Sequence, residues 1–274
     1  MFRIPIIYRV LVFIVVLASC SEYERILKSD DYQMKYDAAM AYYENEDYIR
    51  AATLIEQILP VYRGTTRADD LSFALAKSYY HRRDYILAAH HFDSFVRDYP
   101  NSEYAEEATY MRAYCNYLLS PRPSLDQGTT RRSIDQFTLF ISRYPDSERV
   151  EQARNLIAEM RAKLLEQSFQ AARLYYDMDD FAAAVIALKN SLNDFPETRH
   201  REEIMFLILK SSFNLAARSI PERQLERFQS TLEEYYAFIE EFPDSRYISE
   251  ARNFFNRAIS VLDDYPVDEL TLEY

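Results

Sequence analysis

The side chains that could carry catalytic or metal chemistry are few in this chain, and their spacing does not suit it. Four histidines occur, at His81, His90, His91 and His200. His90 and His91 are adjacent, so on a helix they point to different sides and cannot share one ion. The sequence contains no glycine-rich phosphate loop, no nucleophile elbow and no cysteine–histidine pairing. We therefore predict a protein that is not an enzyme and that uses no metal and no cofactor.

One cysteine is placed for a covalent modification. Two arginines precede an apolar run from Val10 to Ala18, which is too short to cross a bilayer and has the flanks of a secretory signal. The run ends in Leu17-Ala18-Ser19-Cys20, which resembles the bacterial lipobox, where cleavage falls just before the cysteine and its thiol is acylated. The alternative is an ordinary signal peptide followed by an unrelated cysteine. We predict that residues 1–19 are removed and that Cys20 anchors the chain to a membrane by its acyl chains.

Cys115 is the only other cysteine, and it has no intramolecular partner once Cys20 is acylated. We expect it to be a small buried apolar residue. An exported chain without a disulfide must then be stabilised by packing. Ser21 follows the modified cysteine; aspartate at that position is associated with retention in the inner membrane. Its absence favours the outer membrane of a Gram-negative cell, with the chain facing the periplasm.

The charge of the chain excludes one class of partner. The full sequence has a net charge of −12, and removal of residues 1–19 leaves 30 basic side chains against 44 acidic ones, or about −14. A strongly acidic chain binds nucleic acid poorly, because the phosphate backbone is itself anionic. We therefore predict no nucleic-acid partner.

Aromatic residues recur at a fixed spacing, and this spacing predicts the elements that hold them. One pattern consists of two adjacent tyrosines, an aspartate, a further aromatic residue and an alanine, and it occurs three times. The three copies are Tyr42-Tyr43-x-x-x-Asp47-Tyr48-x-x-Ala51, Tyr79-Tyr80-x-x-x-Asp84-Tyr85-x-x-Ala88 and Tyr175-Tyr176-x-x-x-Asp180-Phe181-x-x-Ala184. A second pattern, an aromatic and a proline followed two residues later by serine or threonine, occurs four times, beginning at Tyr99, Tyr144, Phe195 and Phe242. Repetition of this kind indicates a chain built from copies of one small unit.

Each part of the unit has a physical reason. Small residues 12 positions apart, such as Ala76 and Ala88, let two antiparallel helices approach closely across a short turn. Proline after the second helix has no amide hydrogen to continue it. The serine or threonine that follows is expected to cap the next helix. The chain has two glycines and no long run of period-two alternation, which also favours an all-α fold.

These features resemble the tetratricopeptide repeat, whose usual length is about 34 residues. The resemblance implies a right-handed superhelical solenoid of about five helix pairs plus a C-terminal helix. The spacing departs from the usual one: 37 residues separate Ala51 from Ala88, and the later units add 8, 14 and 10 residues to this. We place the 8 extra residues in a loop from Ser120 to Thr130. We place the 14 extra residues in one long helix from about Arg149 to Tyr176. The 10 extra residues fall near Ser219 to Leu225, between the helices of the fifth unit.

The predicted organisation is a signal peptide, an acylated linker, five units, a last helix and a tail. The signal peptide covers 1–19, the acylated linker 20–31 and the tail 264–274. The solenoid covers 32–263. Its five units are about 32–65, 66–102, 103–147, 148–198 and 199–245, and its last helix is 246–263.

Repeat solenoids use a long concave surface to bind other proteins. In tetratricopeptide repeats the first helix of each unit lines this groove. On the register above, nine residues of the first three units lie at or near it, most of them aromatic: Tyr36, Tyr43, Phe73, Lys77, Tyr80, His81, Tyr110, Tyr114 and Tyr117. The alternative is that about half of them pack between helices.

From residue 20 to about 263 the chain resembles the BamD family of outer-membrane lipoproteins, on the combination of lipobox, five repeats, a loop in unit three and a long helix in unit four. The resemblance implies a non-enzymatic subunit of the β-barrel assembly machinery. Its implied partners are the periplasmic domains of the barrel-forming assembly subunit, at the later repeats, and unfolded outer-membrane proteins, at the early repeats. The longer fifth unit and the extra helix from Arg246 to Leu262 depart from the family, so contacts at that end do not transfer.

Two other functions fit the same features. The first is a lipid-anchored repeat adaptor for other cell-envelope proteins, such as those that remodel peptidoglycan. The second is a nutrient-binding lipoprotein of the cell surface, although such proteins are usually much longer. Copurification separates the three, because each implies a different bound partner.

Overall fold

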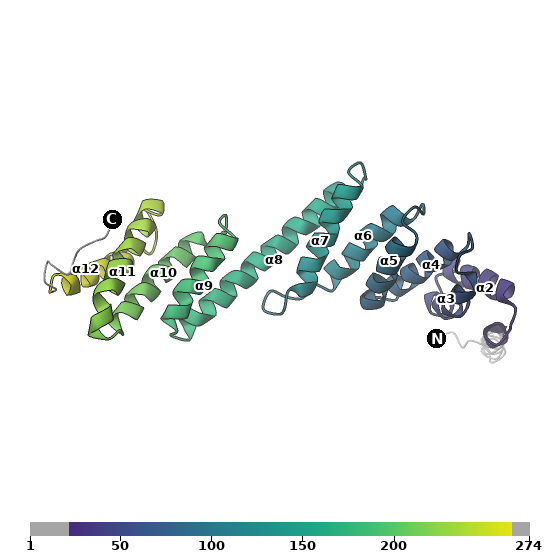
Figure 1. The fold of residues 1–274 in the computed structure, drawn as a ribbon, viewed down its shortest axis with the longest axis horizontal. Coiled ribbons are helices and arrows are strands. Elements are labelled where there is room, and N and C mark those ends of the chain that lie inside the picture. The colour runs from purple at the N-terminus through teal and green to yellow at the C-terminus, as the bar shows by residue number, and fades with distance from the viewer. Residues whose placement is uncertain (1–21, 265–274) are drawn as a thin grey trace, which may run out of the picture. The chain divides into compact units, whose positions relative to one another are not determined.

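The structure is a computed structural model, and it describes residues 22–264. The predicted signal peptide, Cys20 and the residues from 265 onward lie outside this range. Within it every regular element is a helix (Figure 1). After a short helical segment at residues 22–27, the helices are α2 (Tyr32–Glu44), α3 (Tyr48–Tyr62), α4 (Ala68–His81), α5 (Tyr85–Asp98), α6 (Ala105–Leu118), α7 (Gly128–Arg143), α8 (Val150–Asp177), α9 (Phe181–Asp194), α10 (Arg201–Ala217), α11 (Pro221–Glu241) and α12 (Ile248–Leu262).

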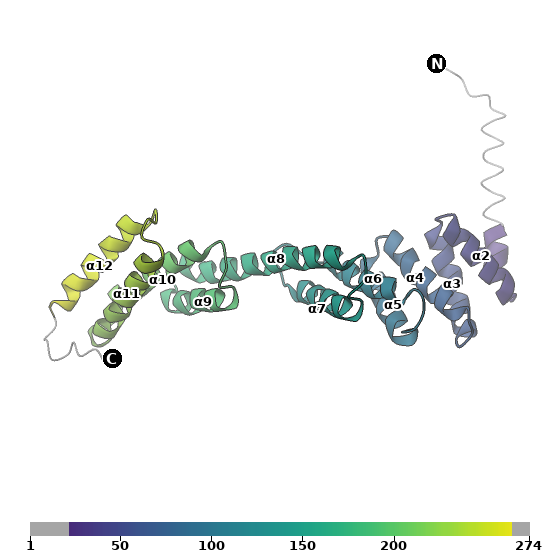
Figure 2. The ribbon, with the colours of Figure 1, turned by 90° about the horizontal axis from the view of Figure 1, so that it is seen from above.

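The helices form two compact units. Of the described residues, the first unit contains 22–121 together with Gln127–Met160, and the second contains Arg122–Asp126 together with 161–264. Inside each unit, helices that are consecutive in sequence pack side by side, from α2 through α7 in the first and from α9 through α12 in the second (Figures 1 and 2). The predicted all-α fold of tetratricopeptide-like helix pairs with a last helix is confirmed.

The long helix predicted from about Arg149 to Tyr176 is present as α8, with 28 residues. Its beginning belongs to the core of the first unit, where Ala153, Ile157 and Met160 are buried. Its later part supplies Phe169 and Ala172 to a core cluster of the second unit.

The alanines predicted to lie at helix crossings are buried. The six side chains are at most 3% exposed; they are Ala39, Ala51, Ala76, Ala88, Ala172 and Ala184. In the third repeat Ser133 takes the place of the second alanine, and its hydroxyl donates a 2.8 Å hydrogen bond to the Ala113 carbonyl across the same crossing. The buried serine is therefore tolerated, because its polar atom is satisfied.

The aspartate of the repeated fragment caps the second helix of its pair. In three turns its Oδ1 accepts a hydrogen bond of 3.1–3.3 Å from the amide three residues later; these caps are Asp47, Asp84 and Asp180. The residue before each cap has a left-handed backbone, with φ of 62° at Glu46, 61° at Arg83 and 60° at Asp179. This conformation reverses the chain in three residues, and the cap satisfies an amide that the new helix leaves free.

The serine or threonine after Pro100, Pro196 and Pro243 does not cap the next helix, so that prediction was wrong for α6, α10 and α12. The residues at the N-caps of α4, α6, α10 and α12 make no side-chain capping bond. A backbone turn, such as that from the Ala105 amide to the Ser102 carbonyl, sets the hydroxyl too far before the helix. The hydroxyl instead donates to a carboxylate in the first turn of the first helix of its own repeat, as Ser102 does to Asp69 at 3.0 Å and Ser245 to Glu202 at 2.7 Å. This bond links the end of a repeat to its first helix.

The two remaining insertions lie partly where predicted. The loop of the third repeat spans 119–127, and α7 begins at Gly128, slightly before the predicted end of the loop. The extra residues of the fifth repeat do not form a connection near Ser219 to Leu225. They lengthen both helices, since α10 has 17 residues and α11 has 21. Pro221 stands at the first turn of α11, where its fixed φ favours helix initiation.

Candidate functional site: an aromatic row on the first helices

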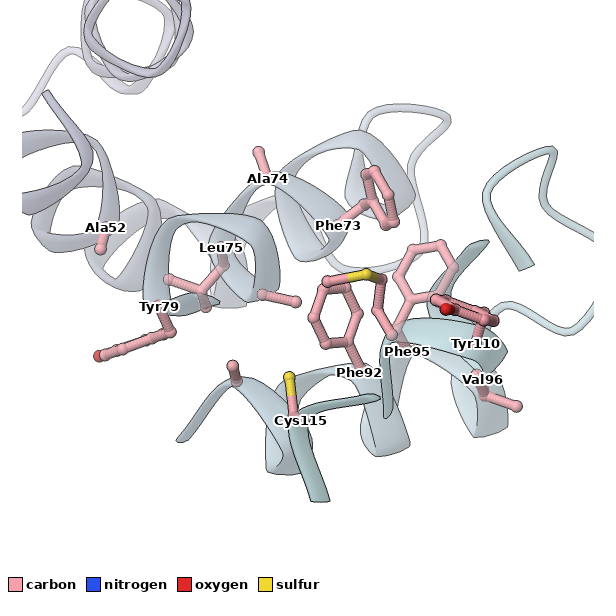
Figure 3. Close-up of a cluster of buried hydrophobic side chains, with 14 of the residues drawn as sticks. Ala52, Phe73, Ala74, Leu75, Tyr79, Phe92, Phe95, Val96, Tyr110 and Cys115 are labelled. Atoms are coloured by element: carbon pink, nitrogen blue, oxygen red, sulfur yellow. The ribbon is translucent and has the colours of Figure 1, made fainter. Parts of the chain in front are cut away.

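Two of the nine predicted groove residues are buried in the core. Phe73 is 8% exposed and Tyr110 is 3% exposed. Figure 3 shows both among the buried side chains of the first unit, beside Phe92 and Phe95. Phe73 stacks on Tyr104 with ring centroids 4.5 Å apart. These two rings therefore offer no open surface to a partner.

Five of the remaining residues come together with Tyr48 in one continuous row of rings. We call this group the aromatic row; it consists of Tyr43 from α2, Tyr48 from α3, Tyr80 and His81 from α4, and Tyr114 and Tyr117 from α6. The distances between consecutive ring centroids are 5.9 Å (Tyr43–Tyr48), 4.4 Å (Tyr48–His81), 5.4 Å (His81–Tyr80), 6.4 Å (Tyr80–Tyr114) and 5.7 Å (Tyr114–Tyr117). The row therefore crosses three successive repeats.

The rings of the row are partly open to solvent, with the tyrosines half-buried and His81 exposed. Aromatic pairs at these separations contribute about 0.5–1.5 kcal/mol each beyond their buried area. The row is thus held in place by its own ring contacts while one part of each ring remains available. Such a surface suits the apolar and aromatic side chains of an extended segment.

The pKa values of several groups in the row are shifted in the direction that keeps these groups uncharged at neutral pH. Burial raises the pKa of Tyr43 to about 12 and also raises the pKa of Tyr80. Burial, and then the hydrogen bond to Glu159, raises the pKa of Tyr117. Burial, and then the Lys77 ammonium, lowers the pKa of His81. Tyr43, Tyr80, Tyr117 and His81 are accordingly uncharged at pH 7, and the three tyrosine hydroxyls are hydrogen-bond donors.

The Tyr117 hydroxyl anchors the end of the row to α8. The Tyr117 hydroxyl lies 3.0 and 2.9 Å from the two carboxylate oxygens of Glu159, on α8. Lys77 donates to Glu107 at 2.9 Å, and the Arg149 guanidinium lies 4.8 Å from the centre of the Tyr110 ring. Charged groups therefore border the row and pair with one another.

Tyr36 is not part of the row. Its ring lies 5.4 Å from that of Tyr62, and the Arg67 guanidinium lies 4.6 Å from its centre. This smaller group belongs to the first helix pair and the start of α4.

The cysteine and histidines do not form a reactive centre. Cys115 is fully buried, and burial raises its thiol pKa to about 12, so the expectation of an inert apolar residue is confirmed. His91 stacks on Tyr79, and His200 on Phe169. Among residues 22–264, no group of three or more histidine, cysteine, aspartate or glutamate side chains could hold a metal ion.

Comparison with known proteins identifies the family. The model of the YfiO family, described as outer membrane lipoprotein, matches residues 28–220 and 167–267. The chain belongs to the YfiO family. The two matches overlap, as a chain of internal repeats allows. No curated protein matches the chain.

In the part of this YfiO-family chain that the structure describes, no helix is long and apolar enough to span a bilayer. The described residues are thus helical repeats, and the family description attaches them to the outer membrane as a lipoprotein. The aromatic row of this family member contains tyrosines from both helices of a pair, since Tyr43 lies on α2 and Tyr48 on α3.

Sequence reasoning missed two members of the site. Tyr48 was overlooked because the first helix of each unit was expected to supply the whole lining, although Tyr48 is part of the repeated fragment itself. Glu159 was overlooked because carboxylates on helices are common, and only the packing of α8 brings this one to Tyr117. The first had a signal in the sequence, and the second did not.

Proposed function

We propose that this chain is a lipid-anchored, non-enzymatic scaffold of the machinery that assembles β-barrel proteins in the outer membrane. It faces the periplasm, binds unfolded outer-membrane proteins through its first three repeats, and binds the periplasmic domains of the barrel-forming assembly subunit through its later ones. Membership of the YfiO family, the lipobox at Leu17–Cys20 and the BamD resemblance support this proposal.

The observation that carries the proposal is the aromatic row. The resemblance implies clients whose terminal segments are extended and end in an aromatic residue. Successive side chains of an extended segment alternate in direction, so every second one faces the same surface. A row of partly open rings across three repeats offers several neighbouring contacts to such a segment.

The second unit offers a different kind of surface for the assembly subunit. Large apolar side chains are exposed at one end of its helix pairs, with Leu174 57%, Met178 66% and Ile220 64% exposed. The turns that carry Met178 and Ile220 are joined by the ion pair of Arg218 and Asp179 at 3.2 Å. Exposed apolar groups bordered by charges are typical of protein-binding sites. We therefore assign client binding to the first compact unit and docking of the assembly subunit to the second compact unit.

The experiment compares two double variants. Removing the rings in Tyr80→Ala with Tyr117→Ala should weaken binding of a client peptide about tenfold or more, because each aromatic at a binding hot spot contributes about 2 kcal/mol. The matched control is Tyr80→Phe with Tyr117→Phe, which keeps both rings and removes only the hydroxyls; it should bind nearly as wild type. The probe is a fluorescent peptide of alternating apolar and polar residues ending in phenylalanine, and its partner probe ends in alanine.

The assembly subunit's affinity is measured on the same preparations, after circular dichroism shows that the helices are intact. The Ala pair should leave that affinity nearly unchanged. Equal loss of both partners would show that the tyrosines are structural. Loss of neither would remove the row from the mechanism and favour the adaptor for peptidoglycan-remodelling proteins.

A further inference from the structure

A cleft of about 620 Å³ lies in the first compact unit, on α5, α6 and α7. Its volume is in the range of sites that bind small ligands or short peptide segments. It does not overlap the aromatic row. Asn116 of α6 faces the cleft, whereas Tyr114 and Tyr117 lie on roughly the opposite side of the same helix. The cleft is therefore a separate feature of this unit.

The long loop of the third repeat contributes one residue to the cleft. The turns within the other helix pairs have three residues, whereas nine residues, 119–127, separate α6 from α7. Leu119 begins this loop and lines the cleft, and Thr129 and Arg132 of the first turns of α7 line it as well.

The charge of the cleft is positive although the whole chain is acidic. Its one acidic lining residue, Asp93, is already paired with Arg97 and with Arg112, the latter at 2.9 Å. Arg132 is exposed and has no ion pair with any residue that the structure describes. One unpaired guanidinium beside a neutralised aspartate matches one carboxylate of a ligand.

The floor of the cleft holds a pair of side-chain amides. Asn116 Nδ2 donates to Gln136 Oε1 at 2.8 Å and to the Arg112 carbonyl at 3.1 Å. Over residues 22–264, neither the Asn116 Oδ1 nor the Gln136 Nε2 atom has a hydrogen-bond partner. The pair therefore presents one acceptor and one donor, which are the two groups that an extended peptide backbone needs.

An aliphatic edge completes the cleft. Ile86 is 68% exposed at its rim, and Ala89 and Leu119 lie in the lining. Ile49 occupies the equivalent position one repeat earlier, 37 residues before Ile86, and is 63% exposed, but it lines no part of this cleft. An aliphatic side chain of a ligand would cover Ile86 and gain apolar burial.

We propose that this cleft is a docking site for a short, extended peptide segment of a partner protein, in which aliphatic side chains alternate with carboxylates. The guanidinium of Arg132 receives a carboxylate, the amides of Asn116 and Gln136 pair with the peptide backbone, and Ile86 and Leu119 contact the aliphatic side chain. The site is independent of client binding on the aromatic row. It gives the first unit two peptide-binding faces.

Fluorescence anisotropy with the full-length mature chain tests the proposal. The probe is a labelled, end-blocked heptapeptide that contains two leucines and three glutamates, and the control peptide has lysines in place of the glutamates. We expect saturable binding of the acidic peptide and none of the basic one. Arg132→Glu should weaken binding tenfold or more, and Arg131→Glu, its exposed neighbour outside the cleft, less than twofold.

The aliphatic contact is tested in the same way. Ile86→Ser should weaken binding about fivefold, and Ile49→Ser should have no effect. The Tyr80→Ala, Tyr117→Ala pair should bind the acidic peptide as wild type does, which excludes the aromatic row as the site. Both isoleucines are exposed, so neither variant threatens the fold.

Three results would overturn the proposal. Equal affinity for the acidic and basic peptides would show that no carboxylate is recognised. Equal effects of Arg131→Glu and Arg132→Glu would reduce the interaction to general electrostatic attraction. Displacement of the peptide by submillimolar inorganic phosphate would identify a site for a free anion in place of a peptide.

Discussion

Glu166 connects α8 to the start of α10 in the second unit, and its ionisation should stabilise that connection. Its Oε2 atom accepts a hydrogen bond from Arg199 at 2.8 Å and lies 2.9 Å from His200 Nε2, while Gln170 donates to Oε1 at 2.8 Å. The bonds from Arg199 and His200 outweigh the cost of burial and lower the pKa of Glu166 to about 2. We predict that Glu166→Gln destabilises the second unit at neutral pH.

The magnitude follows from the pKa. A fall from 4.5 to about 2 corresponds to a ceiling of about 3 kcal/mol, at about 1.4 kcal/mol per pH unit. Arg199 is 75% exposed, so water screens its part of the interaction. We therefore expect a loss of about 1–2 kcal/mol in the free energy of unfolding. Because the folded-state pKa is depressed, the stabilisation is fully present above about pH 4.5 and is lost as the pH falls toward 2.

Urea unfolding followed by far-ultraviolet circular dichroism measures this difference at neutral pH and at about pH 3. Hydrogen exchange read by mass spectrometry locates the loss, which should fall on residues 161–217. The matched control is Glu197→Gln, since Glu197 is exposed and makes no ion pair with the described residues. The reasoning would be refuted if Glu166→Gln cost the same at both pH values, or if Glu197→Gln cost as much.

Two further predictions concern the anchor and the helix crossings. Cys20→Ala should yield an unacylated chain, either uncleaved or processed elsewhere; mass spectrometry of the N-terminus checks this, and an unmodified Cys20 in the wild type would contradict it. Ala88→Phe should overpack a crossing where the native side chain is fully buried, and should lower stability by about 1–3 kcal/mol in thermal unfolding. Ala182→Phe, on the exposed side of α9, is its control, and an equal melting temperature for both variants would mean that the crossing has room for a ring.

The helix pairs could be predicted from the sequence because their signals are local. Alanines 12 residues apart, an aspartate at the turn and a proline at the end each act within one or two helical turns. The fifth repeat shows where prediction from these local signals fails. Residues 221–241 contain no glycine, and their single proline stands at the first helical position, so nothing interrupts the helix and the extra length extends it.

The site could be predicted only in part, because a helical stripe does not separate groove from core. Tyr110, Tyr114 and Tyr117 share one face of α6 at spacings of four and three residues. Tyr110 nevertheless packs edge-on against Phe137 and Phe140 of α7, while Tyr114 and Tyr117 remain partly open. The difference depends on which neighbouring helix covers each turn, and the sequence of α6 carries no record of that.

Asn116 and Tyr117 show why the two proposed peptide sites can be tested independently. They are adjacent in sequence, yet one residue is about 100° of rotation around a helix. Tyr117 belongs to the aromatic row and binds Glu159 of α8, whereas Asn116 lies in the cleft and binds Gln136 of α7. A substitution that acted only by loosening α6 would weaken both sites together. Selective loss of one peptide with retention of the other therefore cannot be explained by a general defect in this helix, and it would assign each face its own ligand.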